Sequence, residues 1–177
     1  DVCSSDLVVI TMLITSSNNE NIKRIIKLKD KKYRDMDHEF LVEDEHLVNE
    51  ALKLGLVKTI ITASDKEYNV TTYNVDEKIM KLLSSQVTST KVMAVCNTLE
   101  EKELEGNTII LDEIQDPGNL GTIIRSAVAF NFKNIILSSN SVDLYNPKVI
   151  RASEGMIFNI NIIRKNLLEY LPTIKDR

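Results

Sequence analysis

Short apolar runs alternate along this chain with stretches in which apolar residues recur at helical spacing. Runs rich in β-branched residues are typical of strands, and amphipathic stretches are typical of helices. The pattern predicts strands at Glu39–Glu43, Leu56–Thr62, Asn69–Tyr73, Lys91–Cys96, Thr108–Ile114, Lys133–Ser139 and Met156–Ile163. It predicts helices from Ser16 onward, at Glu45–Leu54, from Asp76 to Leu83, after Asn119, at Pro147–Ser153 and at Asn166–Leu171. Alternating strands and helices favour an α/β fold.

One stretch, Leu111–Phe130, has the order strand, tight turn, amphipathic helix. The sequence Asp116-Pro117-Gly118 ends the strand, because proline cannot donate to a strand ladder and glycine permits positive φ. Asn119 is expected as the N-cap of the helix. Arg125 follows six residues later. We therefore expect both side chains near the carboxyl end of the strand, where open α/β sheets place ligand sites.

The predicted helix that starts near Ser16 is strongly basic. Seven positive charges fall within twelve residues, against the single acid Asp30. Such a cluster is either a solvated helix face or a contact for the phosphate backbone of RNA, which needs clustered cations more than exact spacing. Tyr33 could stack on a base, although a lone tyrosine is more often a packing residue. The candidate RNA-binding residues are Lys23, Lys27, Lys31, Lys32 and Arg34.

A linker and a leader set the expected domain boundaries. The polar, acidic segment at residues 98–107 is expected to be a linker between a small α/β domain at residues 12–97 and a second domain at residues 108–177. The first eleven residues match neither a signal peptide nor the pattern that follows. We expect residues 1–11 to be a non-native or artefactual leader, and Met12 to be the natural start.

Composition excludes several classes of protein. The chain is 43% hydrophobic and 27% charged, with a net charge of −4, so it has no global basic signature. No apolar run approaches the ~18 residues that a membrane span needs. Cys3 and Cys96 show no metal-ligand spacing, which favours a reducing, cytoplasmic setting. His38 and His46 form a lone pair, whereas a stable metal site wants three or four ligands, so no metal is expected.

Three ordered motifs in the second half resemble a known family. They are Asp116-Pro117 with Asn119, Gly121, Ile123 and Arg125-Ser126-Ala127, then Asn146-Pro147, then Arg151-Ala152-Ser153 with Gly155. This pattern is similar to the SpoU/TrmH family of RNA ribose 2′-O-methyltransferases. The first half resembles the substrate-binding domain that precedes the catalytic domain in many members. The residues that resemble it are Ile14-Thr15-Ser16, Ile22-Lys23, Lys31-Lys32-Tyr33-Arg34, Phe40-Leu41-Val42-Glu43, Leu47-Val48 and Glu50-Ala51-Leu52.

The resemblance implies methyl transfer from S-adenosylmethionine to a ribose 2′-hydroxyl of rRNA or tRNA. It also implies an α/β domain of the SPOUT type, with a C-terminal trefoil knot, and a homodimer of the full-length protein. By carry-over, Arg125 helps to deprotonate the hydroxyl and Asn119 positions the catalytic groups. A guanidinium with a pKa above ~12 is a poor base, so Arg125 has a second possible role as an anchor for phosphate and developing alkoxide. The sequence leaves both roles open.

Departures from the family pattern suggest a further expectation. Asp44 stands where the family usually has glycine, and Asn131 and Met156 replace small residues. Nothing in residues 164–177 resembles the family's two later motifs, which build the knot and most of the cofactor pocket. We therefore expect a C-terminally truncated member with an incomplete SPOUT-like domain, no cofactor-binding residues of its own and no activity alone.

Two alternatives remain. The chain is a non-catalytic RNA-binding protein that uses its basic N-terminal helix, or a nucleotide-binding α/β domain. The second alternative is weak, because the spacing of Gly118 and Gly121 is not that of a dinucleotide-binding loop.

Overall fold

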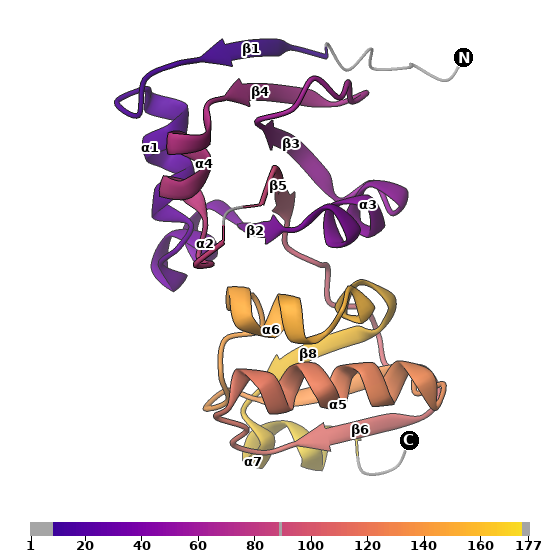
Figure 1. Cartoon of the computed structure of the whole chain (residues 1–177). Helices are drawn as coiled ribbons and strands as arrows, with labels where there is room; N and C mark the ends of the chain where they lie inside the picture. Colours follow the sequence, from indigo (N-terminus) through magenta and orange to yellow (C-terminus); the bar gives the residue numbers. More distant parts are fainter. Residues whose placement is uncertain (1–8, 89, 175–177) are drawn as a thin grey trace, which may run out of the picture. The chain divides into compact units, whose positions relative to one another are not determined.

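The computed structural model describes residues 9–88 and 90–174, which form two compact units (Figure 1). The first unit ends at Thr98, and the second begins at Leu99. Residues 1–8, which include Cys3 and most of the expected leader, lie outside the described residues.

The first unit is a mixed five-stranded sheet with helices on both faces. Its strand order is β1-β4-β3-β5-β2; β1, β4 and β3 are parallel, and β5 runs antiparallel to both β3 and β2. The elements in chain order are β1 (Thr11–Ile14), α1 (Glu20–Lys27), α2 (Lys31–Asp37), β2 (Glu39–Glu43), α3 (Glu45–Lys53), β3 (Val57–Thr62), β4 (Thr71–Val75), α4 (Glu77–Leu83) and β5 (Val92–Asn97).

Alternation along the strands divides the core of this unit into two layers. Ile61 points into a cluster with Ile25 of α1 and Met80 of α4. Its neighbour Ile60, equally buried, points to the opposite face. The helices α1 and α4 lie side by side on the first face, and α3 packs against β2, β3 and β5 (Figure 1). Both faces are covered, which explains why every residue of β2 is buried.

The N-terminal strand differs from the sequence analysis. Thr11 pairs with Thr72 of β4, and the Ile10 carbonyl accepts the Thr72 N–H at 2.8 Å. Pairing therefore begins before Met12, inside the segment that the analysis excluded. The strand was missed because it is a short edge strand whose Leu13 is 76% exposed, so it lacks a buried periodic pattern.

The basic segment is two helices and not one. Asp30 is the N-cap of α2, and its carboxylate accepts the Lys32 N–H at 2.9 Å. The apolar stripe of α1 ends at Leu28, before this cap. The pattern of apolar residues therefore gave no sign that Asp30 starts a second helix.

The second unit is built on a parallel three-stranded sheet in the order β6-β7-β8. Its elements are β6 (Thr108–Leu111), α5 (Pro117–Ala129), β7 (Asn134–Ser138), α6 (Pro147–Ala152), a 3₁₀ helix η1 (Met156–Asn159), β8 (Asn161–Lys165), α7 (Leu167–Tyr170) and a 3₁₀ helix η2 (Leu171–Ile174). Alternating strands and helices in both units confirm the α/β fold class.

Two predicted strands in this unit are shorter than expected. β6 ends at Leu111, and Glu113 adopts φ +49° in the loop that follows. The strand predicted from Met156 begins only at Asn161, because Glu154 and Gly155 both have positive φ and lead into a 3₁₀ turn. An apolar run alone does not distinguish a buried 3₁₀ turn from a strand.

Two side chains occupy left-handed positions that glycine would favour. Asp44 has φ +97° and caps α3 by accepting the His46 N–H at 2.8 Å. Asn131 has φ +59° just after α5, as the sequence analysis expected. Two of the three departures, Asp44 and Asn131, therefore fall at strained turns, whereas Met156 begins the 3₁₀ helix η1.

The segment predicted to be a linker is bound along the second unit. The Tyr145 hydroxyl accepts the Leu99 N–H at 2.7 Å. Glu101 accepts the Arg164 N–H at 2.9 Å and pairs with Lys165 at 2.6 Å. These contacts fix residues 99–101 to the region around β8.

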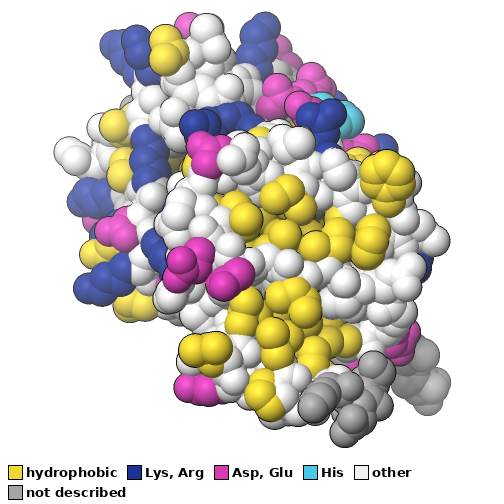
Figure 2. Space-filling view, turned by 90° about the horizontal axis from the view of Figure 1, so that it is seen from below, with side chains coloured by type: hydrophobic (Ala, Val, Ile, Leu, Met, Phe, Trp, Pro, Cys, Tyr) yellow, Lys and Arg dark blue, Asp and Glu magenta, His cyan; other side chains and the backbone are white. Residues whose placement is uncertain are grey.

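Hydrophobic side chains gather in broad patches on the face shown in Figure 2. In the second unit the large exposed hydrophobic residues include Ile110, Phe130 and Leu168, and β6 is an edge strand with Ile110 47% exposed. Among the described helices, none is both long and apolar enough to span a bilayer.

Candidate functional site

The turn between β6 and α5 is organised by Asp116. Its carboxylate caps α5 by accepting the Asn119 N–H at 2.8 Å, and Pro117 occupies the first helical position. The prediction that Asn119 is the N-cap was therefore wrong. Asn119 lies one turn inside, and its exposed side-chain amide makes no hydrogen bond to any residue in the described part of the chain.

Gly121 is required by the contact between α5 and α6. A Cβ atom built at Gly121 would lie 2.4 Å from the Ala152 Cβ and 2.7 Å from the Ala152 carbonyl carbon. Backbone atoms cannot withdraw as a flexible side chain can, so only glycine fits. The spacing between Gly121 and Ala152 in the motifs thus has a packing reason.

Arg125 projects from the exposed side of α5. The neighbouring positions Leu120, Ile124 and Ala127 are buried, whereas Arg125 is exposed. Among residues 9–88 and 90–174, the Arg125 guanidinium has neither an ion pair nor a hydrogen bond. It is therefore available to a ligand.

Asn119 and Arg125 lie apart on the helix. Six residues of α-helix correspond to about 9 Å along the axis and to side chains about 120° apart around it. Arg125 is thus farther from the strand end than the sequence suggested, and the two side chains occupy separate positions on the helix surface.

Hydrogen bonds tie the loops beyond β6 and β7 together. The Glu113 N–H donates to Ser138 Oγ at 2.8 Å, and the Val142 N–H donates to the Ile114 carbonyl at 2.7 Å. Arg164 donates from β8 to the carbonyls of Ser139, at 3.1 Å, and of Ser141 and Val142. Arg164 was not predicted from the sequence, because no local pattern indicates that an arginine near the end of β8 braces the loop after β7.

In the first unit, most side chains of the basic cluster form ion pairs or hydrogen bonds within the chain. Lys23 pairs with Glu20 at 2.9 Å, and Lys31 pairs with Asp35. The other occupied side chains are Arg24, which pairs with Glu39 at 2.5 Å, and Lys29, which donates to the carbonyls of Leu82 and Ser84.

Arg34 does not fit the RNA-binding set. The residue is only 4% exposed, and its Nη1 donates to the carbonyls of Leu28 and Lys29, both at 2.8 Å. A buried guanidinium that satisfies two carbonyls fixes the turn between α1 and α2. We therefore remove Arg34 from the candidate RNA contacts.

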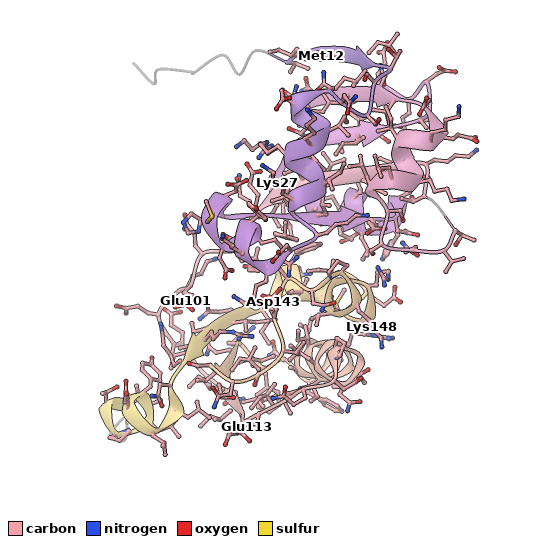
Figure 3. All side chains as sticks on the ribbon, turned by 90° about the vertical axis from the view of Figure 1, so that its left-hand side faces the viewer. Met12, Lys27, Glu101, Glu113, Asp143 and Lys148 are labelled. Carbon is pink, nitrogen blue, oxygen red and sulfur yellow. The ribbon has the colours of Figure 1, made fainter. Side chains whose placement is uncertain are left out.

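Lys27 and Lys32 differ from the rest of the cluster. Their ammonium groups lie 5.5 Å and 5.8 Å from the centre of the Tyr33 ring. Neither has a carboxylate partner within the described residues. Lys27 stands at the C-terminal end of α1, on the surface of the unit (Figure 3).

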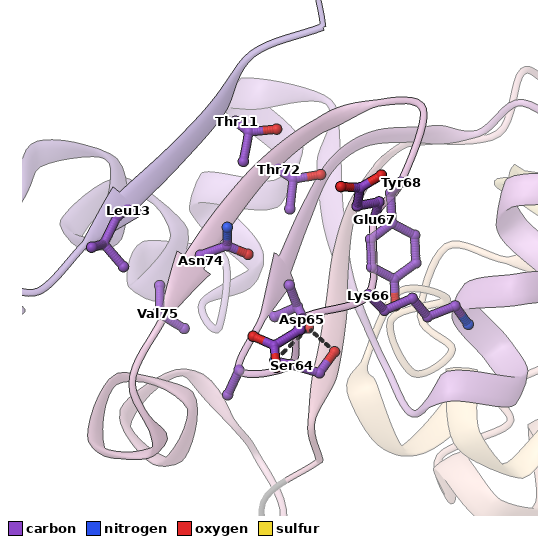
Figure 4. Close-up of a pocket in the computed structure, with 12 residues that line it drawn as sticks. Thr11, Leu13, Ser64, Asp65, Lys66, Glu67, Tyr68, Thr72, Asn74 and Val75 are labelled. Carbon is purple, nitrogen blue, oxygen red and sulfur yellow. Dashed lines mark hydrogen bonds between the residues drawn. The ribbon is translucent and has the colours of Figure 1, made fainter.

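The first unit also contains a polar hollow of about 690 Å³ beside β1 and β4. Asp65 and Glu67 project into it, while Lys66 extends away (Figure 4) and pairs with Glu45 at 2.8 Å. Its two carboxylates would repel phosphate groups. The hollow is therefore a poor site for RNA backbone.

No group of three or more histidine, cysteine or acidic side chains in the described part of the chain is arranged to hold a metal ion. A hollow of about 650 Å³ in the second unit is lined by Asn134 and Asn161, the first residues of β7 and β8. Parallel sheets bind ligands at the opposite, carboxyl ends of their strands. This hollow does not fit a methyl-donor cofactor that serves the α5 site.

Comparison with known proteins identifies the class. Residues 106–177 match the model of the SpoU rRNA methylase family, and residues 19–94 match the MRM3-like substrate binding domain. The chain belongs to the SpoU family, whose members are S-adenosylmethionine-dependent RNA 2′-O-methyltransferases.

Individual relatives agree with this assignment. The 23S rRNA (guanosine(2553)-2′-O)-methyltransferase RlmP of Bacillus subtilis is 37% identical over 92% of this chain and 68% of its own length. The human mitochondrial rRNA methyltransferase 3 is 30% identical over 82% of this chain, which covers only 39% of the human protein. The crystal structure of the AdoMet-bound rRNA methyltransferase from Sinorhizobium meliloti superposes with a TM-score of 0.83, at 29% identity, over 94% of this chain and 69% of that one.

Proposed function

We propose that this chain carries the RNA-facing part of an rRNA ribose 2′-O-methyltransferase. The observation that supports this most strongly is Arg125, an exposed arginine without a partner in the described chain, set in the family's motif and held by the Gly121–Ala152 contact. In this proposal residues 12–97 bind the substrate RNA and residues 108–177 belong to the methyltransferase domain.

The proposed role of Arg125 is electrostatic. A guanidinium keeps its proton at neutral pH, so it acts as a two-pronged donor to a phosphate beside the target ribose and to the developing 2′-alkoxide. Asn119 contacts the RNA at a second point along α5. S-adenosylmethionine supplies the methyl group in this family. The hollow described in the second unit does not fit that cofactor.

The proposed substrate is rRNA, in keeping with the relatives, and the proposed RNA contacts in the first unit are Lys27 and Lys32, with Lys23 and Lys31 as weaker ones. We propose a cytoplasmic protein, supported by the free, buried Cys96 and by the bacterial relative. We also propose that the whole protein works as a homodimer.

Methyl transfer from labelled S-adenosylmethionine to an rRNA fragment, catalysed by the whole protein that contains this chain, tests this function. Replacing Arg125 with alanine should lower turnover by about 10²–10³-fold, the usual effect of removing one donor to a developing oxyanion. The matched control is Lys133→Ala, an exposed cation whose Nζ donates to Asn131. Equal turnover of the Arg125→Ala variant and the control would refute the proposed role.

A second candidate function is non-catalytic RNA binding, favoured by the unpaired lysines around Tyr33. Calorimetry on the whole protein that contains this chain, with S-adenosylmethionine and, separately, with an rRNA fragment, distinguishes the two. Binding of both supports the methyltransferase, whereas RNA binding without cofactor binding supports the second candidate.

A further inference from the structure

Three tyrosines in the described residues have a lysine ammonium near the ring, and one of them differs from the others. The pairs are Lys66 with Tyr68 at 5.4 Å, Lys165 with Tyr170 at 5.9 Å, and Lys27 and Lys32 with Tyr33 at 5.5 Å and 5.8 Å. Lys66 and Lys165 are also held by carboxylates, Glu45 at 2.8 Å and Glu101 at 2.6 Å. Within the described chain, the two lysines at Tyr33 have no such partner.

The surroundings of Tyr33 suit a flat ligand. Tyr33 is half-buried, and Met36, three residues later on the same side of α2, is 64% exposed. Beside Lys27, a surface hollow of about 350 Å³ runs along α1. The site therefore combines an aromatic ring, an exposed thioether and two cations that form no ion pair with a carboxylate in the described residues. Glu20, which also lines the hollow, pairs with Lys23.

We propose that Tyr33 is a stacking platform for an unpaired RNA base, and that Lys27 and Lys32 leave the ring to bind the phosphates on either side of that base. The inference rests on the proposed RNA-binding function and adds to it the kind of RNA that the first unit takes. Every base has a π face, so such a platform binds single-stranded RNA with little sequence preference. Base-paired RNA keeps its bases stacked inside the helix and cannot use the ring.

The magnitudes favour this exchange. An exposed cation–π contact is worth a factor of about two to five in an equilibrium constant. Stacking of a base on an aromatic side chain is worth about five- to 150-fold. Each lysine also gains a phosphate contact when it leaves the ring, so RNA replaces a weak interaction with stronger ones.

The first test measures the affinity of the 177-residue chain for a single-stranded RNA of about 12 nucleotides and for the same RNA as a duplex. Tyr33→Leu should weaken single-strand binding about tenfold and leave duplex binding within a factor of two. Tyr33→Phe keeps the ring and should bind as the wild type does. Tyr68→Leu is the matched control, because its lysine is already held by Glu45.

A second variant keeps the inference testable if Tyr33→Leu fails to fold. The chain contains no tryptophan, so Tyr33→Trp introduces a single fluorescent reporter at the site. Single-stranded RNA should quench that tryptophan, because a stacked base quenches indole emission, and duplex RNA should not. Unchanged emission at saturating single-stranded RNA would overturn the inference.

Salt dependence tests the two lysines. Lys27→Gln and Lys32→Gln, made as separate variants, should each flatten the slope of log K against log salt by about 0.7 for single-stranded RNA. Tyr33→Leu should leave that slope unchanged, because stacking releases no counterion. No RNA binding by the wild-type chain would refute the proposed function itself. Normal RNA binding with an unaffected Tyr33→Leu variant would refute only the stacking platform.

Discussion

The α1–α2 region and helix α5 both contain an arginine that the sequence marks as a candidate functional residue, but the two arginines have opposite roles in the structure. Arg34 is 4% exposed and satisfies two carbonyls, whereas Arg125 is exposed and has no partner in the described chain. Arg24, ten residues before Arg34 and in α1, is held by Glu39. The density of positive charge in the sequence therefore does not show how many cations are left unpaired for a ligand.

The largest expected effect separates the two arginines by stability. Arg34→Met should lower the free energy of unfolding by about 3 kcal/mol, because it leaves one buried and one part-buried carbonyl without their charged donor. Arg125→Met should change it by less than about 0.5 kcal/mol, as expected at an exposed site. Urea unfolding of both variants measures this. Similar losses of stability in both variants would contradict the different roles assigned to Arg34 and Arg125.

The next effect concerns the packing that holds α5. Gly121→Ala should cost about 2 kcal/mol, because the new Cβ meets Ala152 at distances that no side-chain rotation can relieve. Ser126→Ala, on the exposed side of the same helix, is the control and should be neutral or slightly stabilising. A Gly121→Ala variant of unchanged stability would show that α6 can move away from α5 at no cost.

Glu39 provides a pH test of the α1–α2 region. Burial raises the pKa of Glu39, but hydrogen bonds from Lys58 and Arg24 outweigh it and hold that pKa below its ordinary value. A carboxyl with a lowered folded-state pKa stabilises the fold above its unfolded pKa of about 4.3, and this stabilisation is lost as pH falls through the folded value.

The variant Glu39→Gln should therefore be less stable than the wild type at neutral pH. The difference between their unfolding midpoints should shrink as pH falls below about 4. Thermal melts from pH 7 to pH 3 measure this difference. A gap that stays constant across that range would mean that the pair with Arg24 contributes nothing to the fold.

The smallest effect is expected at the exposed ion pairs of the same region. Lys23 pairs with Glu20 and Lys31 with Asp35, all four on the surface. Changing both lysines to glutamine should leave the melting temperature within experimental error, because exposed pairs contribute little. It should weaken RNA binding less than the change of Lys27 and Lys32 does. A larger loss would place the paired lysines at the RNA.

Much of the fold was predictable from local patterns. β2 is Glu39–Glu43 as expected, and Asp76 caps α4 as expected, because a buried run and a cap residue are local signals. β1 was missed because its partner, β4, lies some 60 residues away in the chain. Its own exposed side chains give no periodic signal.

The sequence proposes candidate residues but not the contacts around them. The motif pointed to Arg125 and Asn119 as candidates, yet it could not show that Asp116 is the cap or that Gly121 touches Ala152. These are contacts across the fold. Likewise, only the structure shows that the Arg34 side chain is buried and donates its hydrogen bonds to backbone carbonyls.

Salt dependence of RNA affinity tests the central claim most directly, because it counts the cations that reach the phosphates. Arg125→Gln should flatten the slope of log K against log salt by about 0.7 to 0.9, and Arg24→Gln, which is paired with Glu39, should leave it unchanged. A slope that falls for Arg24→Gln and stays constant for Arg125→Gln would contradict the claim that unpaired cations bind the RNA while paired ones build the fold.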